Sequence, residues 1–128
     1  KNVLHFTEEQ VWALLEKYKV TPPVPYRLGW GRSSCMTCIF NSPKIWSTIS
    51  TYYPERAQLI AGYEQKFDCT ISRSKIDVVS LSNRIEPFDI QDMEALVQSK
   101  IESYYLPVFT DNWTVPPGAF NKEGCGSL

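Results

Sequence analysis

The chain of 128 residues is 43% hydrophobic and 21% charged, which is typical of a soluble globular domain, and its length fits one domain better than two. Its net charge of -1 and its lack of long runs of like charge argue against binding to duplex DNA or to an anionic membrane. No apolar stretch approaches the roughly 18 residues that cross a bilayer. Nucleic acid and membrane partners are therefore not expected.

The amino terminus shows no secretory signal, which makes a cytoplasmic location the default expectation. The sequence begins without Met, and its first Met is Met36. We therefore expect it to be part of a longer protein.

The first predicted helix covers residues 8–20. Thr7 and Gln10 have the spacing of a capping box, and Pro22 prevents the helix from continuing. Helical spacing predicts one apolar face, made of Val11, Trp12, Leu14, Leu15 and Tyr18. Residues 21–34 are rich in Pro and Gly and predict an ordered loop that holds a short extended piece.

Two further helices are predicted from proline positions. Ser42 before Pro43 resembles an N-cap followed by Pro at the first helical position, and this helix ends at Pro54. Pro54 can itself begin the next helix, over residues 55–67. The inward positions expected for this helix are Ala57, Leu59, Ile60, Tyr63 and Phe67.

The remaining segments carry weaker patterns. Residues 71–85 predict a loop with a short helical turn, and Asp89 is expected to cap a helix that continues to Tyr104. After Pro107 the tail is too rich in Pro and Gly for regular structure, although we expect it to pack through Val108, Phe109, Trp113 and Phe120. The sequence thus predicts a mainly α domain of about four or five helices, with a Cys-containing loop and an irregular carboxyl-terminal tail.

The sharpest chemical signal is the C-x-x-C pair formed by Cys35 and Cys38. Two thiolates at this spacing can share one metal ion, and a zinc site or an iron–sulfur cluster then needs two more ligands. Cys125 in the Gly-rich tail is the natural third ligand, and Cys69 or His5 would have to be the fourth. His5 on its own is assigned no role, and Cys69 is expected in the core.

Two other interpretations of the pair stay open. Cys35 and Cys38 could cycle between dithiol and disulfide, with Arg32 favouring the thiolate. They could instead be small apolar residues packed in the core beside Ile39 and Phe40.

A possible anion site lies just before the pair. Arg32, Ser33 and Ser34 offer a guanidinium and two hydroxyls, which suit phosphate or sulfate. An exposed Arg beside ordinary capping hydroxyls would give the same pattern. With one His, no phosphate loop and no Gly-rich dinucleotide motif, the chain contains no complete active site, and its catalytic residues are unknown.

Several of these segments together resemble the carboxyl-terminal section of phosphoadenosine phosphosulfate reductase-like proteins, over residues 7–71. The resemblance is carried by Tyr26-Arg27-Leu28-Gly29-Trp30, by Arg32-Ser33-Ser34-Cys35-Met36-Thr37-Cys38-Ile39-Phe40, and by the Pro54 helix followed by Thr70-Ile71.

This resemblance implies an upstream α/β domain with a Ser-Gly-Gly-x-Asp-Ser phosphate loop that handles an adenine nucleotide or sulfonucleotide. It also implies a role in sulfur metabolism as part of an oxidoreductase, and some relatives contain iron–sulfur clusters. Cys35, Cys38 and Arg32 match the family's paired Cys and a neighbouring basic position. Cys125 departs from the family's Glu-Cys-Gly tail by an inserted Gly.

We therefore expect a domain that supports an upstream nucleotide site. The alternatives are an independent zinc or iron–sulfur module on Cys35, Cys38 and Cys125, or a docking domain with an apolar surface patch around Trp30 and Trp46.

Overall fold

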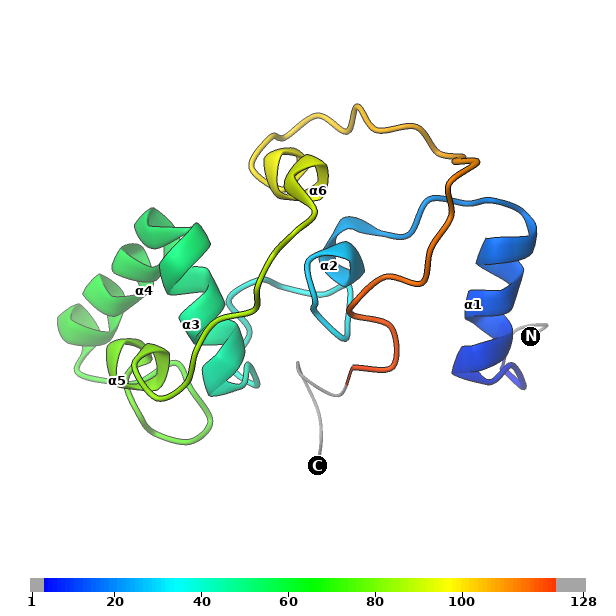
Figure 1. Ribbon diagram of the computed structural model, residues 1–128. Coiled ribbons are helices and arrows are strands. Elements are labelled where there is room, and N and C mark those ends of the chain that lie inside the picture. The colour runs from blue at the N-terminus through cyan, green and yellow to red at the C-terminus, as the bar shows by residue number, and fades with distance from the viewer. Residues whose placement is uncertain (1–3, 122–128) are drawn as a thin grey trace. The chain divides into compact units, whose positions relative to one another are not determined.

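A computed structural model describes residues 4–121 of the chain (Figure 1). The regular structure of these residues consists of six helices and one isolated β-bridge, which confirms the mainly α fold. The helices are α1 (Glu8–Lys17), α2 (Val24–Arg27), α3 (Pro43–Tyr52), α4 (Pro54–Phe67), α5 (Val78–Ser82) and α6 (Met93–Gln98). Within the described residues, no helix combines the length and the apolar character needed to cross a membrane.

The chain forms two compact units. Among the described residues, the first unit combines residues 4–33 with Ile90–Asn121, and the second contains Ser34–Asp89. Helices α1, α2 and α6 belong to the first unit, whereas α3, α4 and α5 belong to the second.

The predicted helix starts at Thr7 and Ser42 are confirmed. The Thr7 hydroxyl accepts the Gln10 N–H at 3.3 Å, and the Gln10 side chain accepts the Thr7 N–H at 2.9 Å, which completes the capping box. The Ser42 hydroxyl accepts the Ile45 N–H at 3.3 Å. Helix α4 begins at Pro54 as expected and ends where Asp68 adopts a left-handed conformation, with φ of 48°.

The core of the second unit is built around α3, which packs against both α4 and α5. Ile45, Trp46 and Ile49 are completely buried on α3, and α5 adds Val78 and Leu81. The Trp46 side chain is therefore part of the core. The expected short helical turn in residues 71–85 is confirmed as α5, which Asp77 caps by accepting the Ser80 N–H at 2.8 Å.

The inward face expected for α4 is wrong in part. Leu59, Tyr63 and Phe67 are exposed, whereas Glu64 is buried with only 9% of its surface accessible. The Glu64 carboxylate accepts the Ile71 N–H and the Val78 N–H, both at 2.9 Å. These two bonds satisfy backbone groups of the segment that returns to α5, so this one polar side chain of α4 is turned inward.

The core of the first unit holds helices and irregular chain together. Helix α2 packs against α6, and the Trp12 ring of α1 meets the Tyr26 ring edge-on at a centroid distance of 5.0 Å. Trp30 is also buried here. An apolar docking patch around Trp30 and Trp46 is therefore wrong, because neither side chain is available at the surface.

The carboxyl-terminal tail packs along residues 19–30 without forming helices. The Thr21 N–H donates to the Val108 carbonyl and the Trp113 Nε1 donates to the Val20 carbonyl, both at 2.8 Å. Of the four apolar tail residues expected to pack, Trp113 is buried and the others are about half exposed, namely Val108, Phe109 and Phe120.

Two expectations for helices of the first unit are wrong. The helix expected from Asp89 to Tyr104 is only α6, which Asp92 caps by accepting the Ala95 N–H at 3.0 Å. It ends early because the Gln98 side chain accepts the Tyr105 N–H and donates to the Ser103 carbonyl, which folds the chain back. Residues 21–34 contain the short helix α2 rather than an extended piece.

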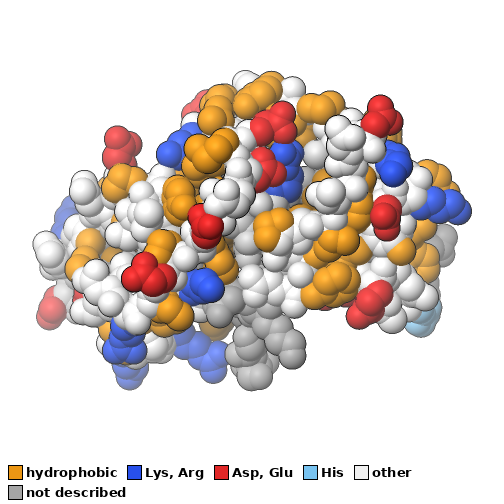
Figure 2. All heavy atoms as spheres, in the orientation of Figure 1, with side chains coloured by type: hydrophobic (Ala, Val, Ile, Leu, Met, Phe, Trp, Pro, Cys, Tyr) orange, Lys and Arg blue, Asp and Glu red, His pale blue; other side chains and the backbone are white. Residues whose placement is uncertain are grey.

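Helix α1 buries less of its apolar face than its spacing predicts. Trp12 is its buried residue, whereas Val11, Leu14 and Tyr18 are exposed. Exposed apolar side chains are not confined to α1. Figure 2 shows them in orange over much of the face that it draws.

Candidate functional site

The Cys pair lies in the irregular segment that precedes α3, within the second unit. Cys35 is exposed and Cys38 is half-buried. Ile39 and Phe40 beside them are 46% and 41% exposed. The interpretation of the pair as packed core residues is therefore wrong, because Cys35 is exposed and neither Cys38 nor its apolar neighbours Ile39 and Phe40 are buried.

Two residues that the sequence did not mark as part of the site hold this segment in place. The buried Asn41 side chain donates to the Met36 carbonyl at 2.6 Å, and its backbone N–H donates to the Cys38 carbonyl at 3.0 Å. The Arg73 N–H donates to the Ile39 carbonyl at 3.0 Å, and its guanidinium lies over the Phe40 ring at 5.6 Å. The Cys loop, residues 34–41, is thus exposed but anchored at several points.

The other two cysteines have different outcomes. Cys69 follows α4 and is exposed, so its expected place in the core is wrong. Cys125 lies outside the described residues. Among residues 4–121, no three His, Cys, Asp or Glu side chains gather closely enough to hold a metal ion. The metal site on Cys35, Cys38 and Cys125 stays a prediction, since its third ligand is not described.

The three anion-site candidates are all exposed. Arg32 and Ser33 belong to the first unit, whereas Ser34 belongs to the second. The nearest helix downstream, α3, begins only at Pro43. Its backbone N–H groups therefore do not follow directly on the two hydroxyls, and the anion site also stays a prediction.

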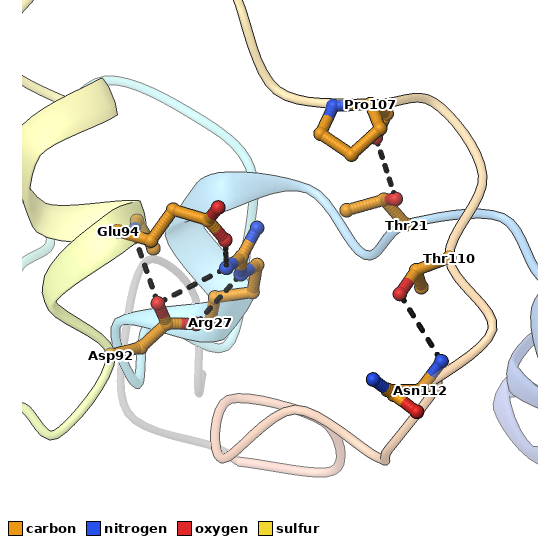
Figure 3. Close-up of polar contacts among 8 residues, drawn as sticks. Thr21, Arg27, Asp92, Glu94, Pro107, Thr110 and Asn112 are labelled. Carbon is orange, nitrogen blue, oxygen red and sulfur yellow. Dashed lines mark hydrogen bonds and ion pairs between the residues drawn. The ribbon is translucent and has the colours of Figure 1, made fainter.

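A charged cluster that the sequence did not indicate lies in the first unit (Figure 3). The Arg27 guanidinium donates from Nε and Nη2 to the Asp92 carboxylate, at 2.7 and 3.1 Å, and from Nη2 to Glu94 at 2.8 Å. The Arg27 side chain is only 13% exposed. Burial tends to lower the pKa of Arg27, but the hydrogen bonds to Asp92 and Glu94 outweigh it, so the pKa of Arg27 is raised above its usual value.

The same contacts act on Asp92 with the opposite sign. Burial tends to raise the pKa of Asp92, but the bonds from Arg27 and from the Ala95 N–H outweigh it, so the pKa of Asp92 is lowered. The pair stays ionised at neutral pH.

This cluster forms one wall of a cavity of about 370 Å³ within the first unit. Thr21 and Pro22 contribute from before α2, and the tail closes the cavity with residues between Pro107 and Pro117. Residues separated by 65 positions, such as Arg27 and Asp92, meet here. No local sequence pattern identifies such a cavity, because its walls come together only in the folded unit.

Comparison of the chain with protein-family models, with characterised proteins and with solved structures finds no match to any of them.

Proposed function

We propose that this chain is the carboxyl-terminal helical domain of a phosphoadenosine phosphosulfate reductase-like protein, in which it supports an adenine-nucleotide or sulfonucleotide site of an upstream domain. The protein would then be an oxidoreductase of sulfur metabolism. The observation that supports this most is the Cys loop, which carries the family-like motif and is exposed yet anchored by Asn41 and Arg73. An anchored, exposed loop can present a reactive group to a second domain.

The exposed apolar residues add to this support. Two residues of α1 (Val11 and Leu14), its C-cap Tyr18, and three residues of α4 (Leu59, Tyr63 and Phe67) leave apolar surface in water. An apolar surface of this kind marks a contact with further protein where its residues form a contiguous patch. The cytoplasm is the compartment we propose, because free thiols such as those of Cys35 and Cys69 persist in a reducing environment.

The test begins with the natural reading frame that encodes this chain. We expect it to encode an upstream α/β domain with a Ser-Gly-Gly-x-Asp-Ser loop. The full-length protein should bind adenylyl sulfate in a calorimetric titration, and Arg32→Ala should weaken this binding whereas Lys100→Ala should not. A reading frame without that loop, or a full-length protein that binds no adenine nucleotide, would refute the proposal.

The accessibility of Cys35 and Cys38 supports a second candidate, a zinc or iron–sulfur module. Its test is elemental analysis of protein purified under reducing, anaerobic conditions, combined with thiol titration. Bound metal should be lost in Cys35→Ser, Cys38→Ser and Cys125→Ser, whereas Cys69→Ser should retain it. Wild-type protein without zinc or iron, and with all four thiols reactive, would eliminate this candidate.

A further inference from the structure

The cavity beside Arg27 has hydrogen-bonding groups that the protein itself does not use. Arg27 donates to Asp92 and Glu94 through Nε and Nη2, which leaves the two N–H groups of Nη1 without a partner among residues 4–121. Glu94 accepts through Oε2, and its side chain is 59% exposed, so Oε1 is free to accept another bond. A donor and an acceptor thus lie on neighbouring side chains of one wall.

The opposite wall adds groups of both kinds. Asn112 and Thr114 line the cavity, and within the described part of the chain their side chains make no hydrogen bond. Figure 3 shows Asn112 on the tail, across from the Arg27 cluster. Pro116 and the ring of Trp113 supply apolar surface, and the Trp113 Nε1 is already bonded to the Val20 carbonyl.

The charges of the cavity limit what it can take. One guanidinium and two carboxylates give the cluster a net negative charge, which disfavours phosphate or sulfate. A cation would meet a net charge of −1, but both carboxylates already accept bonds from Arg27, and a cation could not use the free N–H groups of Nη1. A neutral ligand that both donates and accepts is the better match, because it can use Nη1 and Oε1 together without disturbing the ion pairs.

We propose that this cavity binds the adjacent hydroxyl groups of a neutral sugar ring, either a free monosaccharide or the ribose of a nucleoside. One hydroxyl would accept from the Arg27 Nη1 and donate to the Glu94 Oε1, and its neighbour would bond to Asn112. The apolar edge of the ring would lie against Trp113. The volume of about 370 Å³ is near the lower end of small-molecule sites, which suits a ligand of this size. This inference does not rest on the proposed function.

The test is an NMR titration of the whole chain that follows the indole N–H of Trp113. The probes are glucose, adenosine, deoxyadenosine, n-butylamine and inorganic sulfate. We expect glucose or adenosine to shift the Trp113 signal in a saturable way. Binding of adenosine but not deoxyadenosine would identify ribose as the group recognised, whereas tighter binding of glucose would identify a monosaccharide.

Two variants separate recognition from folding. Asn112→Ala removes an exposed side chain that makes no bond within the protein, and it should weaken binding about tenfold. Gln91→Ala removes an exposed amide of the same unit that does not line the cavity, and it should leave affinity unchanged. The inference is overturned if neither sugar shifts the signal, if n-butylamine or sulfate binds more tightly, or if Asn112→Ala binds as well as wild type.

Discussion

The buried carboxylate of Glu64 gives the sharpest stability prediction. It joins α4 to the segment that follows, because one oxygen accepts the Ile71 N–H and the other accepts the Val78 N–H at the first residue of α5. Glu64→Gln preserves the size of the side chain but replaces one acceptor with an NH₂ donor. That donor then faces a backbone N–H that has lost its partner.

The magnitude follows from the bond that is lost. A hydrogen bond to a charged group contributes about 1.5–3 kcal/mol, and leaving a buried donor unsatisfied costs a further amount of about 1–3 kcal/mol. Since the two contributions overlap, we expect Glu64→Gln to lower the free energy of unfolding by about 2–4 kcal/mol. This is a large share of the stability of a small domain, which is about 5–15 kcal/mol.

Urea unfolding followed by circular dichroism measures this change, and hydrogen exchange locates it. The amides of Ile71 and Val78 should exchange faster in the variant, and those of α1 in the first unit should not. Glu55→Gln, an exposed substitution on the same helix, is the matched control and should cost less than about 0.5 kcal/mol. Equal stability of the two variants would refute the role assigned to Glu64.

Three further predictions follow from local geometry. A Cβ at Gly118 would lie 2.1 Å from the Trp30 carbonyl oxygen, so Gly118→Ala should lower the free energy of unfolding by roughly 2–4 kcal/mol. A Cβ at Gly62 meets no atom within 4 Å, so Gly62→Ala should raise the free energy of unfolding by up to about 1 kcal/mol. Urea unfolding of both variants tests this. Thr7→Ala removes the capping box and should cost about 1 kcal/mol, seen as faster exchange of the α1 amides; unchanged exchange would contradict it. Folding lowers the pKa of Asp92 below its ordinary value of 3.8. The ionised Asp92 therefore stabilises the folded state at pH values above 3.8, and this stabilisation is lost as the pH falls through the lowered pKa. Asp92→Asn should therefore be less stable at neutral pH but lose less further stability in acid, and parallel pH profiles of the two proteins would disprove this.

The sequence predicts helices best where a local signal marks their ends. Capping residues and prolines act over one turn, so the starts of α1, α3 and α4 at Thr7, Ser42 and Pro54 were accessible from spacing alone. The same signals failed for α6. Its apolar spacing continues to Tyr104, but the side chain of Gln98 competes for the backbone and ends the helix.

Which face of a helix is buried depends on partners that spacing does not reveal. Helix α4 carries an apolar stripe, yet its buried contact includes Glu64, because two backbone N–H groups from distant residues need an acceptor. Spacing in the sequence does not reveal the division into two units either. Residues 4–33 and Ile90–Asn121 belong to one unit, although the whole second unit, Ser34–Asp89, separates them in the sequence.

The sequence marks the cysteines of the Cys loop but not the residues that hold the loop in place. The C-x-x-C spacing marks Cys35 and Cys38, whereas the anchors Asn41 and Arg73 act through carbonyl groups that carry no sequence signature. The cavity at Arg27 was missed for the same reason, because its ion pairs connect residues 65 and 67 positions apart.

The most direct measurement of the central proposal is differential alkylation of the thiols in the full-length protein, with and without adenylyl sulfate, read by mass spectrometry. If the Cys loop supports a nucleotide site, Cys35 and Cys38 should become protected when the nucleotide binds, while the exposed Cys69 stays equally reactive and serves as the internal control. Unchanged reactivity of Cys35 and Cys38 at saturating nucleotide would contradict the proposal.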